Sequence, residues 1–114
     1  MQHKHLQFGR GFRVMLGDRH GQAAQMTLEP GRAEGGPGNR HQGSDQWLFV
    51  VEGNGEAVIE GERVELHDGT LVLISRGEEH EVRNTGDGPL RTLNVYTPPA
   101  YDESGNELAW GKSG

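Results

Sequence analysis

The chain has 114 residues, enough for one domain with its own hydrophobic core. Hydrophobic residues make up only 32% of it and glycines number 19, which disfavours a helical bundle and is typical of short strands joined by turns. The net charge of −6, without a Lys/Arg-rich run, excludes an electrostatic nucleic-acid surface, and the lack of cysteine excludes disulfides and thiolate chemistry.

The N-terminal stretch has no apolar run long enough for a signal peptide, and no stretch of the chain reaches the length of a membrane span. We therefore expect a cytoplasmic protein whose partner is a small molecule rather than a membrane or a nucleic acid.

Alternation of apolar and polar residues predicts strands in the first half of the chain. Strands are expected at residues 12–16 and 24–29, with Pro30 and Gly31 ending the second. Residues 32–44 are rich in Gly, Asn and Pro and are expected to form a loop. A strand then runs from residue 46 to 53, with one set of alternating side chains facing inward (Gln46, Leu48, Val50) and the other outward (Trp47, Phe49, Val51).

The second half continues as strands and turns. Residues 56–60 and 63–67 are expected to pair as a hairpin around Glu60 and Gly61. Residues 70–75 are almost continuously apolar, which predicts a strand buried on both faces. Further strands are expected at residues 80–84 and 90–96.

Eight or so short strands without a sustained helical period predict an all-β sandwich or barrel. The expected division of the chain is an N-terminal arm with the first strand at residues 1–22, a barrel at residues 23–97 and a C-terminal extension at residues 98–114. Tyr101 and Trp110 suggest that part of this extension packs against the barrel.

Two motifs resemble those of the cupin family. The first family motif is glycine, five residues, His, one, His, three or four, Glu, six and Gly. In this chain Asn39 stands at the first His, His41 at the second, Gln46 at the Glu and Gly53 at the closing Gly. The opening glycine is displaced, with Ala33 at its strict position.

The second family motif is glycine, five residues, Pro, one, Gly, two, His, three and Asn. Its positions are filled, at every required spacing, by Gly69, Ser75, Gly77, His80 and Asn84, with serine in place of proline. The chain thus resembles a small, single-domain bacterial cupin. The resemblance implies a double-stranded β-helix, also called a jelly roll, with ligands that project into the mouth of the barrel.

In the family, three His and one Glu hold a divalent metal such as Fe, Mn, Ni, Zn or Cu. The resemblance therefore implies a metal site at Asn39, His41, Gln46 and His80, with an amide in place of one imidazole and of the carboxylate. Because imidazole and amide ligands are neutral, we expect weaker metal binding than at a site with the full set. Asp45 lies next to Gln46, but strand alternation aims it away from the barrel interior.

Several polar residues remain as candidates near the mouth of the barrel. Tyr96 is a candidate general acid or orienting hydroxyl. Four further polar candidates lie on the later expected strands and in the C-terminal extension: Arg83, Arg91, Asn94 and Tyr101. Asn84 is expected to satisfy backbone groups at a strand end.

Three functions are compatible with these residues. One is a metal-dependent enzyme, such as a dioxygenase or isomerase, acting on a small molecule. Another is a metal-free module that binds or senses a sugar-like or anionic ligand. The third, ranked last, is an inactive barrel used as a dimeric interaction domain. The outward Trp47 and Phe49 favour a homodimer in each case.

Overall fold

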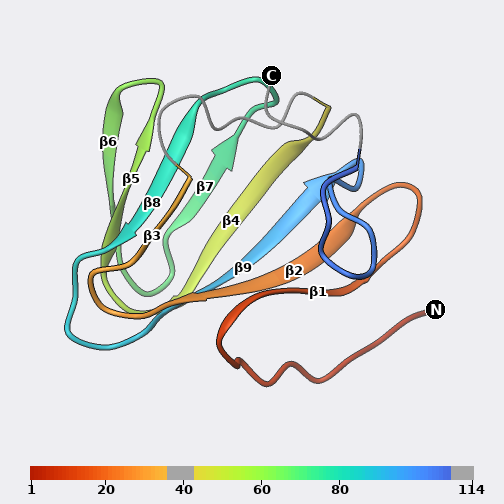
Figure 1. The fold of residues 1–114 in the computed structure, drawn as a ribbon, viewed down its shortest axis with the longest axis horizontal. Coiled ribbons are helices and arrows are strands. Elements are labelled where there is room, and N and C mark those ends of the chain that lie inside the picture. Colours follow the sequence, from red (N-terminus) through yellow and green to blue (C-terminus); the bar gives the residue numbers. More distant parts are fainter. Residues whose placement is uncertain (36–42, 109–114) are drawn as a thin grey trace.

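The computed structural model describes residues 1–35 and 43–108. It contains two β-sheets, with strand orders β1-β2-β9-β4-β7 and β3-β8-β5-β6 (Figure 1). The strands are β1 Gly11–Gly17, β2 Gln22–Leu28, β3 Ala33–Gly35, β4 Asp45–Glu52, β5 Gly55–Ile59, β6 Glu62–Leu66, β7 Leu71–Ile74, β8 His80–Asn84 and β9 Leu90–Thr97. None of the described residues belongs to a helix that could cross a membrane.

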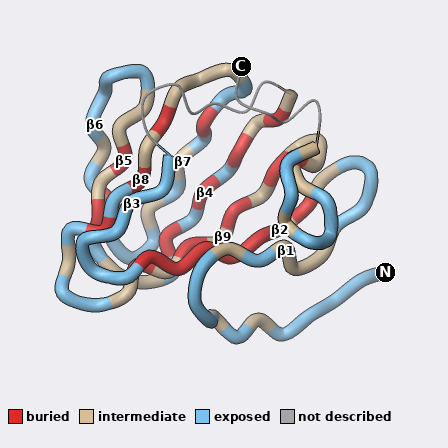
Figure 2. Tube along the Cα trace, in the orientation of Figure 1, coloured by how far each residue is buried: buried red, intermediate tan, exposed pale blue. Residues whose placement is uncertain are grey.

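The two sheets enclose a common hydrophobic core, which confirms the predicted double-stranded β-helix. The larger sheet and the smaller sheet both contribute buried apolar side chains to one cluster, and Figure 2 shows these buried positions recurring along the strands. The cluster comprises Met26, Leu28, Leu48, Val50, Ala57, Leu66, Val82 and Leu90. A core of this kind holds the sheets at a fixed separation and leaves the barrel mouth for polar residues.

Strand β4 shows the predicted alternation. Its inward residues Gln46, Leu48 and Val50 are buried, whereas Trp47 and Phe49 are 43% and 40% exposed. The inward register of β8 is also as predicted, because His80, Val82 and Asn84 are all buried.

Two expectations from the sequence were wrong. Strand β7 is not buried on both faces, because Leu71 and Leu73 are 60% and 45% exposed. The physical reason is that both side chains lie on the outer face of the larger sheet, which the neighbouring central strand β4 also exposes at Trp47 and Phe49. Within the expected loop 32–44, residues Ala33–Gly35 form strand β3 and pair with β8. This short exposed strand has no alternating pattern by which it could have been recognised.

Asn84, the last residue of β8, holds the chain segments at that end of the strand through three hydrogen bonds. Its Nδ2 donates to the carbonyl oxygens of Leu28 and Gly88, each at 2.8 Å, and its Oδ1 accepts from the N–H of Gly86 at 2.8 Å. The Asn84 side chain is buried, and its hydrogen bonds take the place of water as partners of the three backbone groups. The predicted structural role of Asn84 is confirmed.

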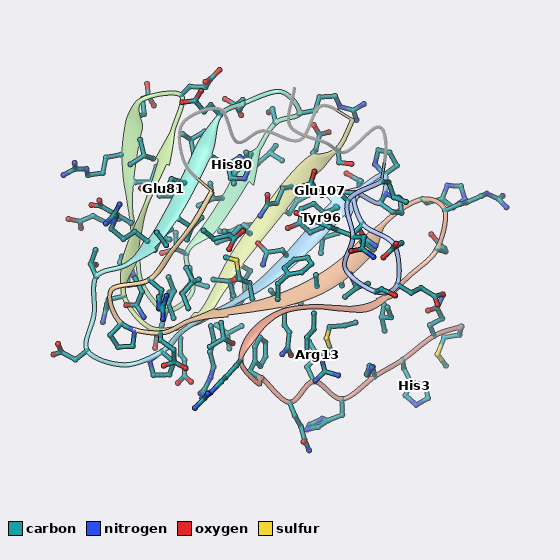
Figure 3. The ribbon with its side chains drawn as sticks, in the orientation of Figure 1. His3, Arg13, His80, Glu81, Tyr96 and Glu107 are labelled. Carbon is teal, nitrogen blue, oxygen red and sulfur yellow. The ribbon has the colours of Figure 1, made fainter. Side chains whose placement is uncertain are left out.

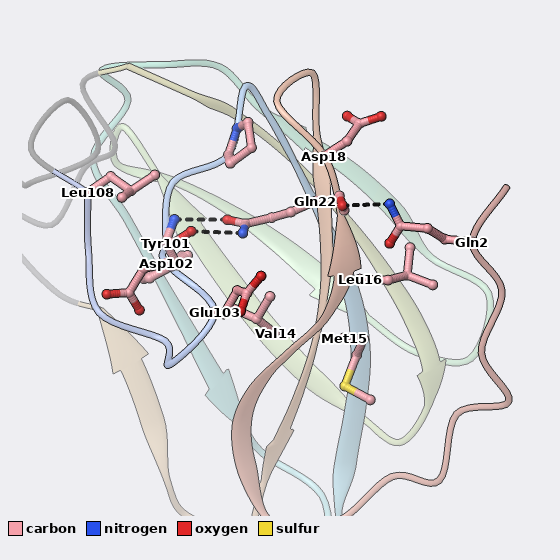
Figure 4. Close-up of a pocket in the computed structure, with 12 residues that line it drawn as sticks. Gln2, Val14, Met15, Leu16, Asp18, Gln22, Tyr101, Asp102, Glu103 and Leu108 are labelled. Atoms are coloured by element: carbon pink, nitrogen blue, oxygen red, sulfur yellow. Dashed lines mark hydrogen bonds between the residues drawn. The ribbon is translucent and has the colours of Figure 1, made fainter.

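Gln22 attaches the C-terminal segment to the barrel (Figure 4). Its Oε1 accepts from the N–H groups of Ala100 and Tyr101 at 2.9 and 2.8 Å, and its Nε2 donates to the carbonyl oxygen of Tyr101 at 2.9 Å. Beyond this clamp the chain turns back on itself, and Tyr101 forms an antiparallel bridge with Glu107. Asp102 stabilises the turn by accepting from the N–H groups of Ser104 and Asn106, each at 2.9 Å.

We expect Asn84→Ala to lower the free energy of unfolding by about 2 kcal/mol, because the buried carbonyl oxygen of Leu28 and two partly buried backbone groups lose their partner. Urea unfolding followed by circular dichroism measures this difference. Thr85→Ala, at the exposed neighbouring position, is the matched control and should change stability by less than about 0.5 kcal/mol. Equal stabilities of Asn84→Ala and the parent protein would contradict this role.

Replacing Gln22 tests the clamp on the C-terminal segment. In Gln22→Leu, amide exchange at Ala100 and Tyr101 should accelerate roughly 10- to 100-fold, while exchange in β4 and β9 stays slow. Gln22→Glu keeps an acceptor for both amides and should preserve their protection. Unchanged exchange in Gln22→Leu would show that packing alone holds the segment in place.

Candidate functional site

A cavity of about 250 Å³ opens at the mouth of the barrel, where the C-terminal segment lies against the strands. Its described polar lining comes from both sheets and from that segment: Glu34, Gln46, His80, Tyr96, Tyr101 and Glu107. Apolar side chains of Phe12, Met26 and Val82 also line it. Figure 3 labels His80, Tyr96 and Glu107 around this region.

Strand register places the central residues of the site side by side. Tyr96 in β9 is directly opposite Gln22 in β2 and Gln46 in β4, and Gln46 is opposite Ile74 in β7. The four residues form one row across the larger sheet, and all are buried. The residue that clamps the C-terminal segment therefore lies in the same row as two residues of the cavity.

A directed chain of hydrogen bonds orients Gln46. The Thr92 hydroxyl donates to the carbonyl oxygen of Met26 at 3.0 Å, and Asn94 Nδ2 donates to Thr92 Oγ1 at 3.0 Å. Gln46 Nε2 then donates to Asn94 Oδ1 at 2.9 Å. Because a backbone carbonyl can only accept, each donor in this chain has its direction fixed, and Gln46 must present Oε1 on its other side.

Gln46 Oε1 is a buried acceptor that has no hydrogen-bond partner among the described residues. The residue is 4% exposed and lines the cavity. An unpaired buried acceptor costs free energy, so such groups in folded proteins mark the place of a ligand, ion or water. The oxygen is therefore available to a cation or to a donor of a bound molecule.

His80 is oriented from behind by the backbone. Its Nδ1 lies 3.2 Å from the carbonyl oxygen of Glu78, and the residue is 5% exposed. A carbonyl acceptor requires the proton to sit on Nδ1, so that in the neutral ring Nε2 is the nitrogen with the lone pair. Metal-binding histidines are commonly held in this way, with the second ring nitrogen donating to a carbonyl.

Three aromatic rings pack together at the edge of the cavity. The ring centroids of Phe12 and Tyr101 are 4.7 Å apart, those of Tyr96 and Tyr101 5.1 Å, and those of Phe12 and Tyr96 6.5 Å. Burial, together with the negative charges of Glu107 and Glu34, raises the pKa of Tyr101 to about 12. Burial, the neighbouring Tyr101 and the same two carboxylates raise the pKa of Tyr96 well above its usual value. Both tyrosines are therefore neutral hydroxyls at physiological pH.

Glu34 and Glu107 are cavity residues that the sequence did not indicate as such. Glu34 lies in the unrecognised strand β3, and Glu107 is brought to the cavity by its bridge with Tyr101. Glu34 falls at a variable position of the first family motif, and Glu107 lies beyond both motifs. The sequence feature that pointed to Glu107 was indirect: Tyr101 suggested that part of the C-terminal extension packs against the barrel.

The other sequence candidates have different places. Asn39 and His41 lie outside the described residues. Arg83 pairs with Glu81, and Arg91 pairs with Glu52, so neither of these arginines is among the described residues that line the cavity. Asn94 is buried in the hydrogen-bond chain behind Gln46.

Asp45 does not replace the carboxylate of the family motif. It binds Arg76 instead, accepting from its backbone N–H at 2.8 Å, and the side-chain and backbone bonds of Arg76 lower the pKa of Asp45. Within the described part of the chain, no group of three or more His, Cys, Asp or Glu side chains is arranged to hold a metal.

A larger cavity of about 570 Å³ lies elsewhere, between β1 and the C-terminal segment (Figure 4). Its described lining includes Gln2, Gln22 and three acidic residues, Asp18, Asp102 and Glu103, but neither Gln46 nor His80. The smaller cavity is the candidate functional site, because it is lined by the oriented imidazole and by the amide whose oxygen has no partner in the described part of the chain.

Comparison with known proteins identifies relatives of this chain. A Streptomyces glaucescens protein named tetracenomycin polyketide synthase protein TcmJ is 29% identical over 85 residues, which cover 75% of this chain and 56% of that protein. The chain spans about half the length of the curated relatives that it matches.

Solved structures share the fold. A Bacillus halodurans protein is 29% identical with a TM-score of 0.74, over 83% of this chain and 75% of that one. A predicted oxalate decarboxylase from Thermotoga maritima is 25% identical with a TM-score of 0.69, over 77% of this chain and 79% of that one. The sequence profile of the cupin domain matches residues 24–96, which include both motifs and every strand from β3 to β8. Because this match covers more than half of the chain, the protein belongs to the cupin family.

Proposed function

We propose that this cupin binds a divalent metal through Asn39, His41, Gln46 and His80, and that a small-molecule substrate enters the cavity beside it. The observation that carries the proposal is the buried Oε1 of Gln46, which has no hydrogen-bond partner among the described residues. Gln46 stands at the family's carboxylate position, lines the cavity and donates through Nε2 to Asn94. The orientation of His80 supports it, since Nδ1 is engaged with the Glu78 carbonyl.

The described donors fit a divalent cation chemically. Imidazole nitrogen suits Fe, Ni, Zn and Cu, and an amide carbonyl oxygen is a hard neutral donor that suits Mn as well. The four proposed ligands carry no negative charge. Glu34 and Glu107 line the same cavity and offset part of the charge of a dication through space.

The proposed activity is that of a cupin enzyme of the dioxygenase or isomerase type. A divalent metal at this site supplies Lewis acidity toward an oxygen atom of the substrate. The chain's own groups bind and orient the substrate, and the buried hydroxyl of Tyr96 serves as a neutral orienting group. Tyr96 is not a general base in this proposal, because burial and the neighbouring Tyr101 keep its pKa far above neutrality.

The alternative is a binding module without metal. One observation favours it: His80 is the sole histidine among the described residues of the cavity. In that case Gln46 Oε1 and His80 Nε2 accept hydrogen bonds from hydroxyl or amine groups of a ligand. The metal content of the protein separates the two functions.

Untagged protein is reconstituted with Fe, Mn, Ni, Zn and Cu in turn, and its metal content is measured by plasma mass spectrometry. At least one of these metals should reach one equivalent per chain. His80→Ala and Gln46→Leu should lower this content well below one equivalent. His67→Ala, which alters an exposed turn histidine, is the matched control and should leave it unchanged.

A third variant tests the orienting chain itself. Thr92→Val removes the hydroxyl that links Asn94 to Met26 and should weaken metal affinity roughly 10-fold or more, as other changes behind metal ligands do. A parent protein that stays metal-free with all five metals would refute the metal-dependent function and leave the binding module.

We also propose that the protein is a homodimer that uses the outer face of β4 and β7. Exposed apolar side chains are paired across these strands, Trp47 opposite Leu73 and Phe49 opposite Leu71. Val51 extends the same face and is 40% exposed. A contiguous apolar face of this kind on an edge of the sheet is typical of an interface between subunits.

Sedimentation equilibrium should give a mass of about 25 kDa, twice the 12.5 kDa of one chain. The double variant Trp47→Lys/Phe49→Lys should weaken dimerisation roughly 100-fold or more, because it places two charges in the apolar face. Glu65→Lys, on exposed β6, serves as the control and should remain dimeric. A parent protein of 12.5 kDa at all concentrations would exclude this interface.

A further inference from the structure

The mouth of the barrel cavity carries two carboxylates and, among its described lining residues, no Lys or Arg. Glu34 comes from β3 and Glu107 from the C-terminal segment, so two distant parts of the chain contribute negative charge to one opening. Both residues are exposed, and their carboxylates face solvent as well as the cavity. An opening lined by one sign of charge concentrates ligands of the opposite sign.

The negative charge extends into the cavity. Burial is the main cause that raises the pKa of Tyr101, and the charges of Glu107 and Glu34 raise it as well. The same two charges also contribute to the raised pKa of Tyr96, where burial is again the main cause. Since the two tyrosines stay protonated, they present polar hydroxyls and ring faces without adding charge. The described side chains therefore create a field that favours a cation over an anion.

The aromatic rings complete a site for a cationic nitrogen. Phe12, Tyr96 and Tyr101 all line the cavity, and their centroids lie within 4.7 to 6.5 Å of one another. Clustered aromatic rings attract ammonium groups through their ring quadrupoles, and the attraction is strongest where water is excluded. Carboxylates beside such rings add a direct charge interaction.

A second, independent observation shows that the cavity is built to hold a ligand. Gln46 is more than nine-tenths buried, lines the cavity and has an Oε1 without a described partner. A ligand that uses this oxygen therefore reaches from the charged mouth to Gln46 in the larger sheet and to His80 in the smaller one. At about 250 Å³ the cavity has the volume of roughly eight waters, which limits the ligand to a small molecule.

We propose that this cavity selects small organic ammonium compounds, with the cationic nitrogen between Glu34, Glu107 and the aromatic rings and the remainder directed toward Gln46 and His80. The inference rests on the proposed function in placing the substrate in this cavity, and it specifies the charge of that substrate. It sets this chain apart from the relative named as a predicted oxalate decarboxylase, because oxalate is a dianion that these carboxylates would repel.

Three probes of nearly equal shape test the inference. Choline is a cation, 3,3-dimethylbutan-1-ol replaces its nitrogen with carbon, and 3,3-dimethylbutanoate is an anion. Their affinities are measured by chemical-shift titration of ¹⁵N-labelled protein. Choline should bind roughly tenfold more tightly than the alcohol, the anion should bind most weakly, and the preference for choline should fall as ionic strength rises.

The double variant Glu34→Gln/Glu107→Gln should reduce the ratio of choline to alcohol affinity to near one. Glu62→Gln/Glu65→Gln makes the same change in net charge on exposed β6, and should keep the ratio of the parent protein. Thermal unfolding of each variant confirms that it is folded. Equal binding of all three probes, stronger binding of the anion, no binding of any probe, or an unchanged ratio in Glu34→Gln/Glu107→Gln would each overturn the inference.

The titrations are run on metal-depleted and on metal-reconstituted protein, and metal content is measured in parallel. Discrimination between choline and the alcohol in a protein that takes up no metal would refute the metal-dependent function and support the inference. Stoichiometric metal without discrimination would do the reverse. The two proposals therefore fail separately.

Discussion

The hydroxyl of Thr92 donates to the carbonyl oxygen of Met26, an acceptor that cannot reverse its role, and every donor up to Gln46 takes its direction from that bond. Rotating the Gln46 amide would bring its oxygen against Asn94 Oδ1, so the buried chain determines which atom faces the cavity. An amide with a fixed oxygen can stand where the family has a carboxylate, since it keeps an acceptor at that position. It does not keep the charge.

In the proposed site, Glu107 of the C-terminal segment, which lies outside the family motifs, offsets part of the missing charge. Gln22 holds the C-terminal segment with three hydrogen bonds, and the bridge between Tyr101 and Glu107 brings a carboxylate to the cavity mouth. Tyr96 lies between Gln22 and Gln46 in the same row of the larger sheet. The attachment of the segment and the orientation of the site thus depend on neighbouring residues of one rigid sheet, and a change at Gln22 is expected to reach the cavity through Tyr101.

Strand alternation and motif spacing were sufficient to predict the barrel, the inward register of Gln46 and His80, and the structural role of Asn84. They were not sufficient for β7, since an apolar run has the same appearance whether or not another layer covers the outer face of its strand, and Leu71 lies on the exposed outer face of the larger sheet. The position of Glu107 could not be predicted either, because it depends on long-range hydrogen bonds from Gln22 that leave no periodic pattern in the sequence.

The most direct test of the metal site is NMR of protein labelled with ¹³C and ¹⁵N, titrated with Zn²⁺. If Gln46 and His80 are ligands, the Cδ resonance of Gln46 and the Nε2 resonance of His80 will both shift and saturate at one equivalent, while Nδ1 of His80 keeps its proton on the Glu78 carbonyl. Resonances of both residues that stay unchanged, or metal binding through Nδ1, would contradict the orientation on which the account depends.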